Sequence, residues 1–153
     1  MEKCFQIVRL PLILIVQFKR FMKHGFTQKK QNYVDFELND LNLGTYAKVC
    51  DGQLNRYKNY QLYGVCNHFG TMEGGHYIAN CYSQVYKKWY KVSEYNNVNK
   101  LLFIVSKIVY LVNRNNLICT YFKFQYDDNE VFETEESQVK SGAAYILFYS
   151  SIN

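Results

Sequence analysis

Short apolar runs rich in β-branched and aromatic residues restrict this chain more than any other feature of its sequence. Residues 10–18 and 144–149 are the clearest of these runs. Both are too short for a core helix, and Pro11 stands near the start of the first, so each favours a buried strand. Residues 60–66 and a segment beginning at His76 predict two further strands. The sequence therefore predicts an antiparallel sheet with little helix.

Other segments predict the surroundings of these strands. Residues 33–38 alternate polar and apolar side chains with a period of two, which is typical of a half-exposed strand. Residues 84–91 have the pattern of a turn and the returning strand of a hairpin. Residues 39–59 are mostly polar and residues 68–75 are rich in glycine, so both are expected to form loops.

The composition excludes several classes of protein. Hydrophobic residues make up 48% of the 153 residues and charged residues 20%, which is a globular balance and not that of a disordered tail. Two apolar runs, residues 10–16 and 101–112, fall short of the roughly 20 residues of a membrane-spanning helix. The net charge of +5 is mild and the lysines are scattered. We therefore expect neither a membrane nor nucleic acid as a partner.

The cysteines indicate the compartment. Five of them stand at positions 4, 50, 66, 81 and 119. Their odd number, the lack of a Cys-x-x-Cys pair and the lack of a secretory leader predict reduced thiols in the cytoplasm or nucleus. Because the paired cysteines of a zinc site are missing, no metal or other cofactor is predicted.

The strongest chemical signal is a histidine that follows two glycines at the expected start of a strand. Gly74 and Gly75 would let another backbone approach the imidazole of His76 without obstruction by a side chain. Histidine titrates near physiological pH, so His76 is a candidate general base. The pattern alone fits a structural histidine equally well.

Five blocks of residues stand in a set order along the chain. They are Leu10 to Phe21, which ends in Phe18-Lys19-Arg20-Phe21, then Tyr63 to Gly70, Gly74 to Tyr77, Trp89-Tyr90, and Ala144 to Tyr149. Together they resemble the C-terminal half of the catalytic domain of ubiquitin-specific proteases, the papain-like deubiquitinating cysteine peptidases. The resemblance implies an α+β papain-like fold, of which residues 1–153 would form mostly the antiparallel β palm half. It also implies ubiquitin and ubiquitinated proteins as partners.

The resemblance implies roles for the residues around the glycine pair. His76 matches the catalytic histidine, which takes the proton of the nucleophilic cysteine and later protonates the leaving amine. Gly74 and Gly75 match the loop beside the channel for the C-terminal Gly-Gly tail of ubiquitin, and Tyr77 would line that channel. His68 matches a position in the same loop, with a structural or a substrate-positioning role.

The third catalytic member of the family is an Asp or Asn that follows a Trp-x-x-aromatic sequence and orients the imidazole. Read continuously, this chain has Ser93 at that place, and an uncharged serine would orient a cationic imidazole poorly. Joining Lys91 to Tyr126 restores the family pattern and brings Asp127 there, with Asp128 behind it. The resemblance thus assigns Asp127 as the orienting acid and Asp128 as its neighbour, although an acidic pair alone is more typical of a solvated turn.

The residues that this join removes, 92–125, differ in composition from the rest of the chain. These 34 residues contain no Gly, Pro or Asp and carry a charge of +3, which indicates an insertion outside the family pattern. Val92-Ser93 is what the splice-donor-like codons GTA-AGT encode, and Phe124-Gln125 is what the acceptor-like TTT-CAG encodes. Two interpretations remain open: a translated intron, or a genuine loop between two strands.

The block that carries the nucleophilic cysteine of the family, a Gly-Asn-Thr-Cys-like sequence at a helix start, does not occur in the 153 residues. Each of the five cysteines is expected to be a buried or incidental thiol. Two functions follow as alternatives. The first is part of a thiol-dependent hydrolase that cleaves the (iso)peptide bond after the C-terminal glycine of ubiquitin, inactive as this chain alone. The second is an inactive fragment that at most binds ubiquitin weakly.

Overall fold

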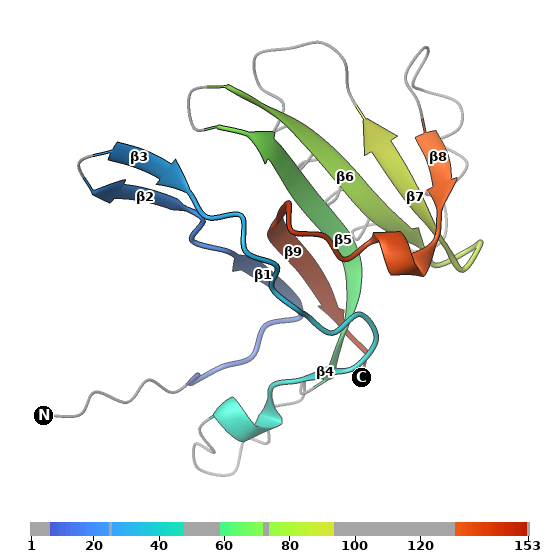
Figure 1. The fold of residues 1–153 in the computed structure, drawn as a ribbon. Helices are drawn as coiled ribbons and strands as arrows, with labels where there is room; N and C mark the ends of the chain where they lie inside the picture. The colour runs from blue at the N-terminus through green and yellow to red at the C-terminus, as the bar shows by residue number, and fades with distance from the viewer. Residues whose placement is uncertain (1–6, 25, 48–58, 72–73, 94–130, 153) are drawn as a thin grey trace, which may run out of the picture.

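A large antiparallel sheet and a separate hairpin make up most of the structure, a computed structural model that describes residues 7–24, 26–47, 59–71, 74–93 and 131–152 (Figure 1). The sheet has the strand order β1-β9-β5-β6-β7-β8, and β4 pairs with the start of β5. Its strands are β1 (Ile13–Gln17), β4 (Leu41–Asn42), β5 (Asn59–Gly70), β6 (Gly75–Ser83), β7 (Lys88–Ser93), β8 (Val131–Thr134) and β9 (Ala144–Ser151). The hairpin consists of β2 (Phe21–His24) and β3 (Phe26–Lys29).

Helix is scarce in the described part of the chain, where the only helical segments are two 3-10 turns, η1 (Gly44–Tyr46) and η2 (Glu136–Gln138). None of the helices found there has the length and the hydropathy that a membrane crossing requires. The mostly antiparallel architecture predicted from the apolar runs is confirmed.

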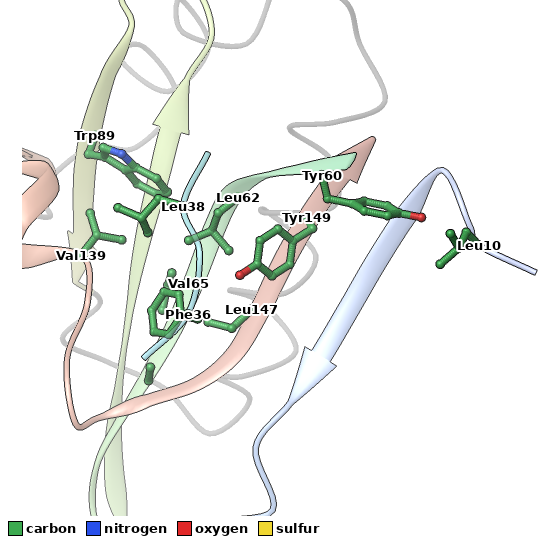
Figure 2. Packing of buried hydrophobic residues seen from close by; sticks show 11 residues of the cluster. Leu10, Phe36, Leu38, Tyr60, Leu62, Val65, Trp89, Val139, Leu147 and Tyr149 are labelled. Atoms are coloured by element: carbon green, nitrogen blue, oxygen red, sulfur yellow. The ribbon is translucent and has the colours of Figure 1, made fainter. Parts of the chain in front are cut away.

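The central strands β5 and β9 are apolar along most of their length because both faces of the sheet are covered there. Leu62 lies opposite Tyr149 and Val65 lies opposite Leu147 in the β5–β9 pair. These four side chains belong to the hydrophobic cluster on one face, and residues from segments outside the strands complete it (Figure 2). A second cluster, formed by side chains of β5, β6 and β9, contains Tyr63, Cys66, Ala79, Cys81, Tyr145, Ile146 and Phe148.

An irregularity in β5 decides which side chains join which cluster. The register between β5 and β9 shifts between Leu62 and Gly64, so that Tyr63 is an extra residue in the ladder. The shift moves the alternation of the side chains by one residue. Leu62 and Val65 therefore share one cluster, while Tyr63 and Cys66 contribute to the other.

The structure confirms several expected strands and corrects others. The strands expected at residues 60–66, from His76 and at 144–149, and the hairpin expected at 84–91, are present as β5, β6, β9 and the β6–β7 hairpin. The first run forms only the short strand β1, and it is an edge strand with Ile15 52% exposed, not a buried one. β5 also continues through His68 to Gly70, where a loop was expected.

The prediction of a strand at residues 33–38 is wrong. Phe36 and Leu38 are buried as their alternation suggests, but they pack on the face of the sheet within the first cluster. The backbone oxygen of Leu38 accepts a hydrogen bond from the amide of Leu62 at 2.7 Å, and that of Glu37 accepts one from the Tyr149 hydroxyl at 2.7 Å. The alternation of polar and apolar side chains at residues 33–38 thus reflects packing against the face of the sheet and not pairing as a strand of it.

The buried face of β9 is expected to carry much of the stability. Leu147 is 2% exposed, so Leu147→Ala would remove apolar contacts and leave a cavity, lowering the free energy of unfolding by about 2–5 kcal/mol. Urea denaturation followed by circular dichroism measures this change. Ile15→Ala on the exposed side of β1 is the matched control and should cost far less. An equal loss in both variants would contradict the placement of the core.

Candidate functional site

The expected site residues lie where β5 ends and β6 begins. His68 pairs with Tyr77, Phe69 pairs with His76, and Gly70 pairs with Gly75 in the register of these two strands. The amide of Thr71 donates a hydrogen bond to the backbone oxygen of Gly74 at 2.9 Å. Gly70 has a φ of +95°, a conformation that side chains disfavour, so the strand can reverse here at little steric cost.

The two glycines before His76 meet different surroundings. A Cβ atom on Gly75 would collide with Nε2 of His68 and would lie 2.5 Å from the backbone oxygen of Phe69. A Cβ atom on Gly74 would have no neighbour within 4 Å. Glycine is therefore a packing requirement at position 75 but not at position 74.

His68 fills the space beside Gly75 and is itself enclosed by rings. It is 3% exposed, its ring centroid lies 4.7 Å from that of Tyr77, and the ring of Phe21 meets it edge-on at 5.2 Å. Its Nδ1 is buried without a hydrogen-bond partner in the described part of the chain. Burial, and then the nearby charge of Lys29, lower the pKa of His68, which favours the neutral imidazole. Of the two roles that the resemblance left open for His68, this placement favours the structural one.

His76 faces away from this aromatic cluster. Successive side chains of a strand point to opposite faces, so His76 lies on the face opposite to Tyr77 and to its partner His68. Ser93 pairs with Ile78, which puts it diagonally across from His76 on one face of the β6–β7 pair. Nε2 of His76 lies 3.0 Å from Oγ of Ser93, within hydrogen-bond distance. Among the described residues, none forms a hydrogen bond with Nδ1 of His76.

The remaining expected site residues are not among those that the structure describes. Asp127 and Asp128 lie outside the described residues, as do Cys4, Cys50 and Cys119. Only the first two residues of the segment 92–125 that stands apart in composition, Val92 and Ser93, belong to the described chain, where they complete β7.

The two described cysteines are poor nucleophiles. Cys66 and Cys81 are both buried and free. Burial raises the pKa of each thiol to about 12, and for Cys81 the neighbouring Cys66 adds to this effect. Since the thiolate is the reactive form, neither sulfur is prepared for attack. Within the described ranges, no three His, Cys, Asp or Glu side chains come together as a metal would need.

Two cations near the site carried no role in the sequence-based interpretation. Arg20 is 3% exposed and donates from Nε to the backbone oxygen of Ala144 at 2.5 Å. Lys29 donates from Nζ to the backbone oxygens of His68 and Gly70, at 2.6 and 3.2 Å. Arg20 stands in the Phe18 to Phe21 block of the resemblance, but no local pattern marks Lys29, because its partners lie about 40 residues away.

The fold and this turn define a class of protein: the antiparallel palm half of a papain-like catalytic domain, with a histidine at the start of a central strand. A family model described as "Ubiquitin carboxyl-terminal hydrolase" matches residues 3–102. The chain belongs to this family. The resemblance inferred from the five blocks is therefore confirmed.

Individual relatives extend the match over nearly the whole chain. Ubiquitin carboxyl-terminal hydrolase 8 of Arabidopsis thaliana is 30% identical over 151 residues, which cover 98% of this chain and 13% of that protein. Ubiquitin carboxyl-terminal hydrolase 2 of Rattus norvegicus is 30% identical and Usp2 of Drosophila melanogaster 35% identical, each over 96% of this chain. The chain spans 18% and 12% of these last two proteins. It thus corresponds to less than a fifth of such relatives.

Solved structures agree on the fold. Ubp8 in a SAGA deubiquitinating module bound to ubiquitin aldehyde has a TM-score of 0.64 to this chain at 23% identity, over 97% of this chain and 26% of that one. The yeast module with an Sgf73 Y57A mutant gives a TM-score of 0.62 at 24% identity, over 97% and 25%. The predicted fold class, a papain-like palm half, is confirmed.

The contrast between the two glycines predicts unequal effects of the same substitution. Gly75→Ala would drive a methyl group against the His68 ring and the Phe69 carbonyl, and overpacking of this kind costs about 1–3 kcal/mol. Gly74→Ala meets open space and should leave the free energy of unfolding nearly unchanged. Urea denaturation of both variants, with amide spectra of residues 68–77, measures the difference. Equal tolerance of the two substitutions would contradict the close approach.

The buried His68 predicts a pH dependence of stability. Its pKa is lowered in the folded state, so the unfolded state binds the proton more readily once the pH falls below the ordinary value of about 6.5. Stability should therefore be highest above that pH and decrease as the pH falls. NMR titration of the His68 ring gives its pKa directly, and a value above 6.5 would contradict the prediction. In His68→Gln, the loss of stability between pH 7.5 and pH 5.5 should be smaller than in the unaltered chain.

Proposed function

We propose that this chain supplies the histidine half of a thiol-dependent hydrolase that cleaves the (iso)peptide bond after the C-terminal glycine of ubiquitin. Membership of the ubiquitin carboxyl-terminal hydrolase family supports the class of reaction. The observation that carries the assignment to His76 is its contact with Ser93 through Nε2. Within the described part of the chain Nδ1 has no hydrogen-bond partner, so in this proposal it is the nitrogen that faces the nucleophile.

The chemistry assigned to His76 has two halves. The imidazole accepts the proton of a cysteine thiol as the thiolate attacks the carbonyl carbon of the ubiquitin glycine, and it then returns this proton to the departing amine. The resulting thioester is hydrolysed by a water molecule, for which the imidazole is again the base. His76 is partly buried at the start of β6, so a substrate carbonyl can approach it at the edge of the sheet.

The nucleophile in this proposal comes from a part of the gene product outside the 153 residues. The raised pKa values of Cys66 and Cys81 support this, because neither thiol would ionise near neutral pH. The partner in catalysis is therefore expected to be a cysteine that reaches the side of His76 not occupied by β7.

We further propose that Asp127 is the residue that orients His76 in the active enzyme, with Asp128 as its neighbour. If residues 92–125 are absent, Lys91 is followed by Tyr126 and Asp127, so Asp127 takes the register position of Ser93. That position is the one that faces Nε2 of His76. A carboxylate there would stabilise the imidazolium, which the hydroxyl of Ser93 cannot do to the same extent.

The pairing of β7 with β8 supports the same excision. Val92 pairs with Val131, so the connection between these partners comprises residues 93–130 in the chain as it stands. Without residues 92–125, Tyr126 would take the place of Val92, and Asp127, Asp128, Asn129 and Glu130 would form a four-residue hairpin loop. Hairpin loops of this length are common, and Asp and Asn are favoured in turns.

The glycine pair is proposed to border the path of the ubiquitin tail. Gly74 is exposed and its missing side chain faces open space, which would leave room for an extended Gly-Gly segment. Tyr77 and His68 pack against one another on the face toward which a side chain at position 75 would point. We infer that these two rings support the turn from that face, which differs from the channel-lining role that the resemblance implies for Tyr77, while Gly74 and Gly75 border the tail.

The test is hydrolysis of a fluorogenic ubiquitin C-terminal amide by the gene product that contains this chain and a cysteine block. His76→Gln should lower kcat about 10⁴-fold, because loss of a triad member removes the proton transfer. Tyr86→Ala, in the exposed β6–β7 turn, is the control and should keep full activity. Sequencing of the transcript identifies the active form, which we expect to lack the codons for residues 92–125 and to lose activity on Asp127→Ala.

Several results would overturn parts of this proposal. Unchanged hydrolysis by His76→Gln would remove His76 from the reaction, and a transcript that keeps the codons for residues 92–125 would remove Asp127 from the position facing it. A ubiquitin electrophile should leave the 153-residue chain unlabelled. Labelling of any of its cysteines would contradict an external nucleophile, and absence of activity in every form of the gene product would favour the inactive ubiquitin-binding fragment.

A further inference from the structure

β5 extends past its neighbour β9, which leaves its last carbonyl groups without a strand to bind. The pairing of β5 with β9 ends at Asn67 and Ala144, whereas β5 continues to Gly70. The amide of His68 donates to the backbone oxygen of Ala143 at 2.9 Å, so the peptide groups of His68 and Gly70 point to the side on which β9 has ended. An unpaired carbonyl group is costly where it is buried, and His68 is 3% exposed, so its carbonyl needs a donor in place of the strand.

Lys29 is that donor. Its Nζ lies 2.6 Å from the backbone oxygen of His68 and 3.2 Å from that of Gly70. One ammonium group therefore binds both carbonyls of the overhang, the end of β5 at residues 68–70 that extends past β9. Phe69, between them, points its carbonyl toward β6, where it lies close to Gly75. A single side chain thus takes the place of the missing strand along this edge, and hydrogen bonds from a charged donor are stronger than neutral ones.

The hairpin that presents Lys29 is itself tied to the sheet. Arg20 donates to the backbone oxygens of Lys30 and Asn32 at 3.0 and 2.9 Å, and to that of Ala144 at the start of β9. The amide of Lys30 donates back to the backbone oxygen of Arg20 at 2.7 Å. Arg20 therefore holds the base of the β2–β3 hairpin against β9, beside the end of β5 where the turn begins (Figure 1).

From these contacts we propose that Lys29 is a positioning residue for the reaction: it holds the β5–β6 turn, and thereby Gly74, Gly75 and His76, in place from the β2–β3 hairpin. The proposal rests on the function proposed for His76. Phe69 pairs directly with His76, and the two carbonyls that Lys29 binds flank Phe69 on both sides. Any displacement of this overhang changes where His76 stands relative to a nucleophile on its free side.

Amide hydrogen exchange in the ¹⁵N-labelled 153-residue chain tests the tether without any need for activity. Lys29→Met removes the donor and keeps the apolar stem, so exchange of the Thr71 amide should become about tenfold faster. Exchange of the buried Leu147 amide in β9 should stay unchanged. Lys29→Arg keeps a cation with several donors and should restore slow exchange at Thr71. Lys30→Met makes the same substitution at an exposed neighbour and should have no effect at either amide.

The outcomes separate the tether from general stability and from the proposed function. Unchanged exchange at Thr71 in Lys29→Met, equal acceleration at Leu147, or the same result in Lys30→Met would each overturn the proposal. If Lys29→Met does not fold, the ammonium protons of Lys29 in the unaltered chain should exchange more slowly than those of Lys30, and equal rates would overturn it. In the gene product with its cysteine, Lys29→Met should lower kcat while KM changes little. Loss of hydrolysis in His76→Gln remains a separate result that tests the function alone.

Discussion

The length of β5 relative to its neighbours β6 and β9 is the constraint on which the rest of this structure depends. Over its first part β5 pairs with β9 and is buried on both faces, and over its second part it pairs with β6. Because β9 begins only at Ala144, the end of β5 is supported from one side by a strand and from the other by the Lys29 ammonium group. The turn that precedes His76 thus follows a strand that begins in the core and ends between β6 and the Lys29 side chain.

Two histidines only eight residues apart lie in different surroundings, because successive side chains of a strand point to opposite faces of the sheet. His68 lies among Phe21, Tyr77 and Tyr145, where burial lowers its pKa and its ring occupies the space that a side chain at position 75 would need. His76 lies on the other face, partly exposed and within reach of Ser93. The buried His68 ring packs beside Gly75, and the partly exposed His76 ring is the one for which we propose a catalytic role. Both follow from the same register, in which Phe69 and Gly70 meet His76 and Gly75.

The apolar runs predicted most of the central sheet because burial on both faces leaves a continuous hydrophobic pattern, as in Ala144 to Tyr149. The prediction failed at residues 33–38, since packing on the face of a sheet gives the same alternation as a half-buried strand. It also failed to find β2, β3 and β8, which are short and lie in the hairpin or at the sheet edge, where no strong pattern is required. The start of a strand near His76 was predicted correctly, because the glycine pair that precedes it is a local signal.

The sequence by itself determined the family and the antiparallel class of the fold, because these depend on ordered local motifs and on the period of apolar residues. It also predicted His76 as a candidate base. The composition of residues 92–125 predicts an insertion outside the family pattern, which stays a prediction. Only the tertiary structure decided that Oγ of Ser93 lies within hydrogen-bond distance of Nε2 of His76, that the His68 ring fills the space beside Gly75, and that Lys29 binds the carbonyl groups at the end of β5. These contacts join residues 7 to 41 positions apart, and hydrogen bonds between such residues depend on strand register, which local sequence does not encode.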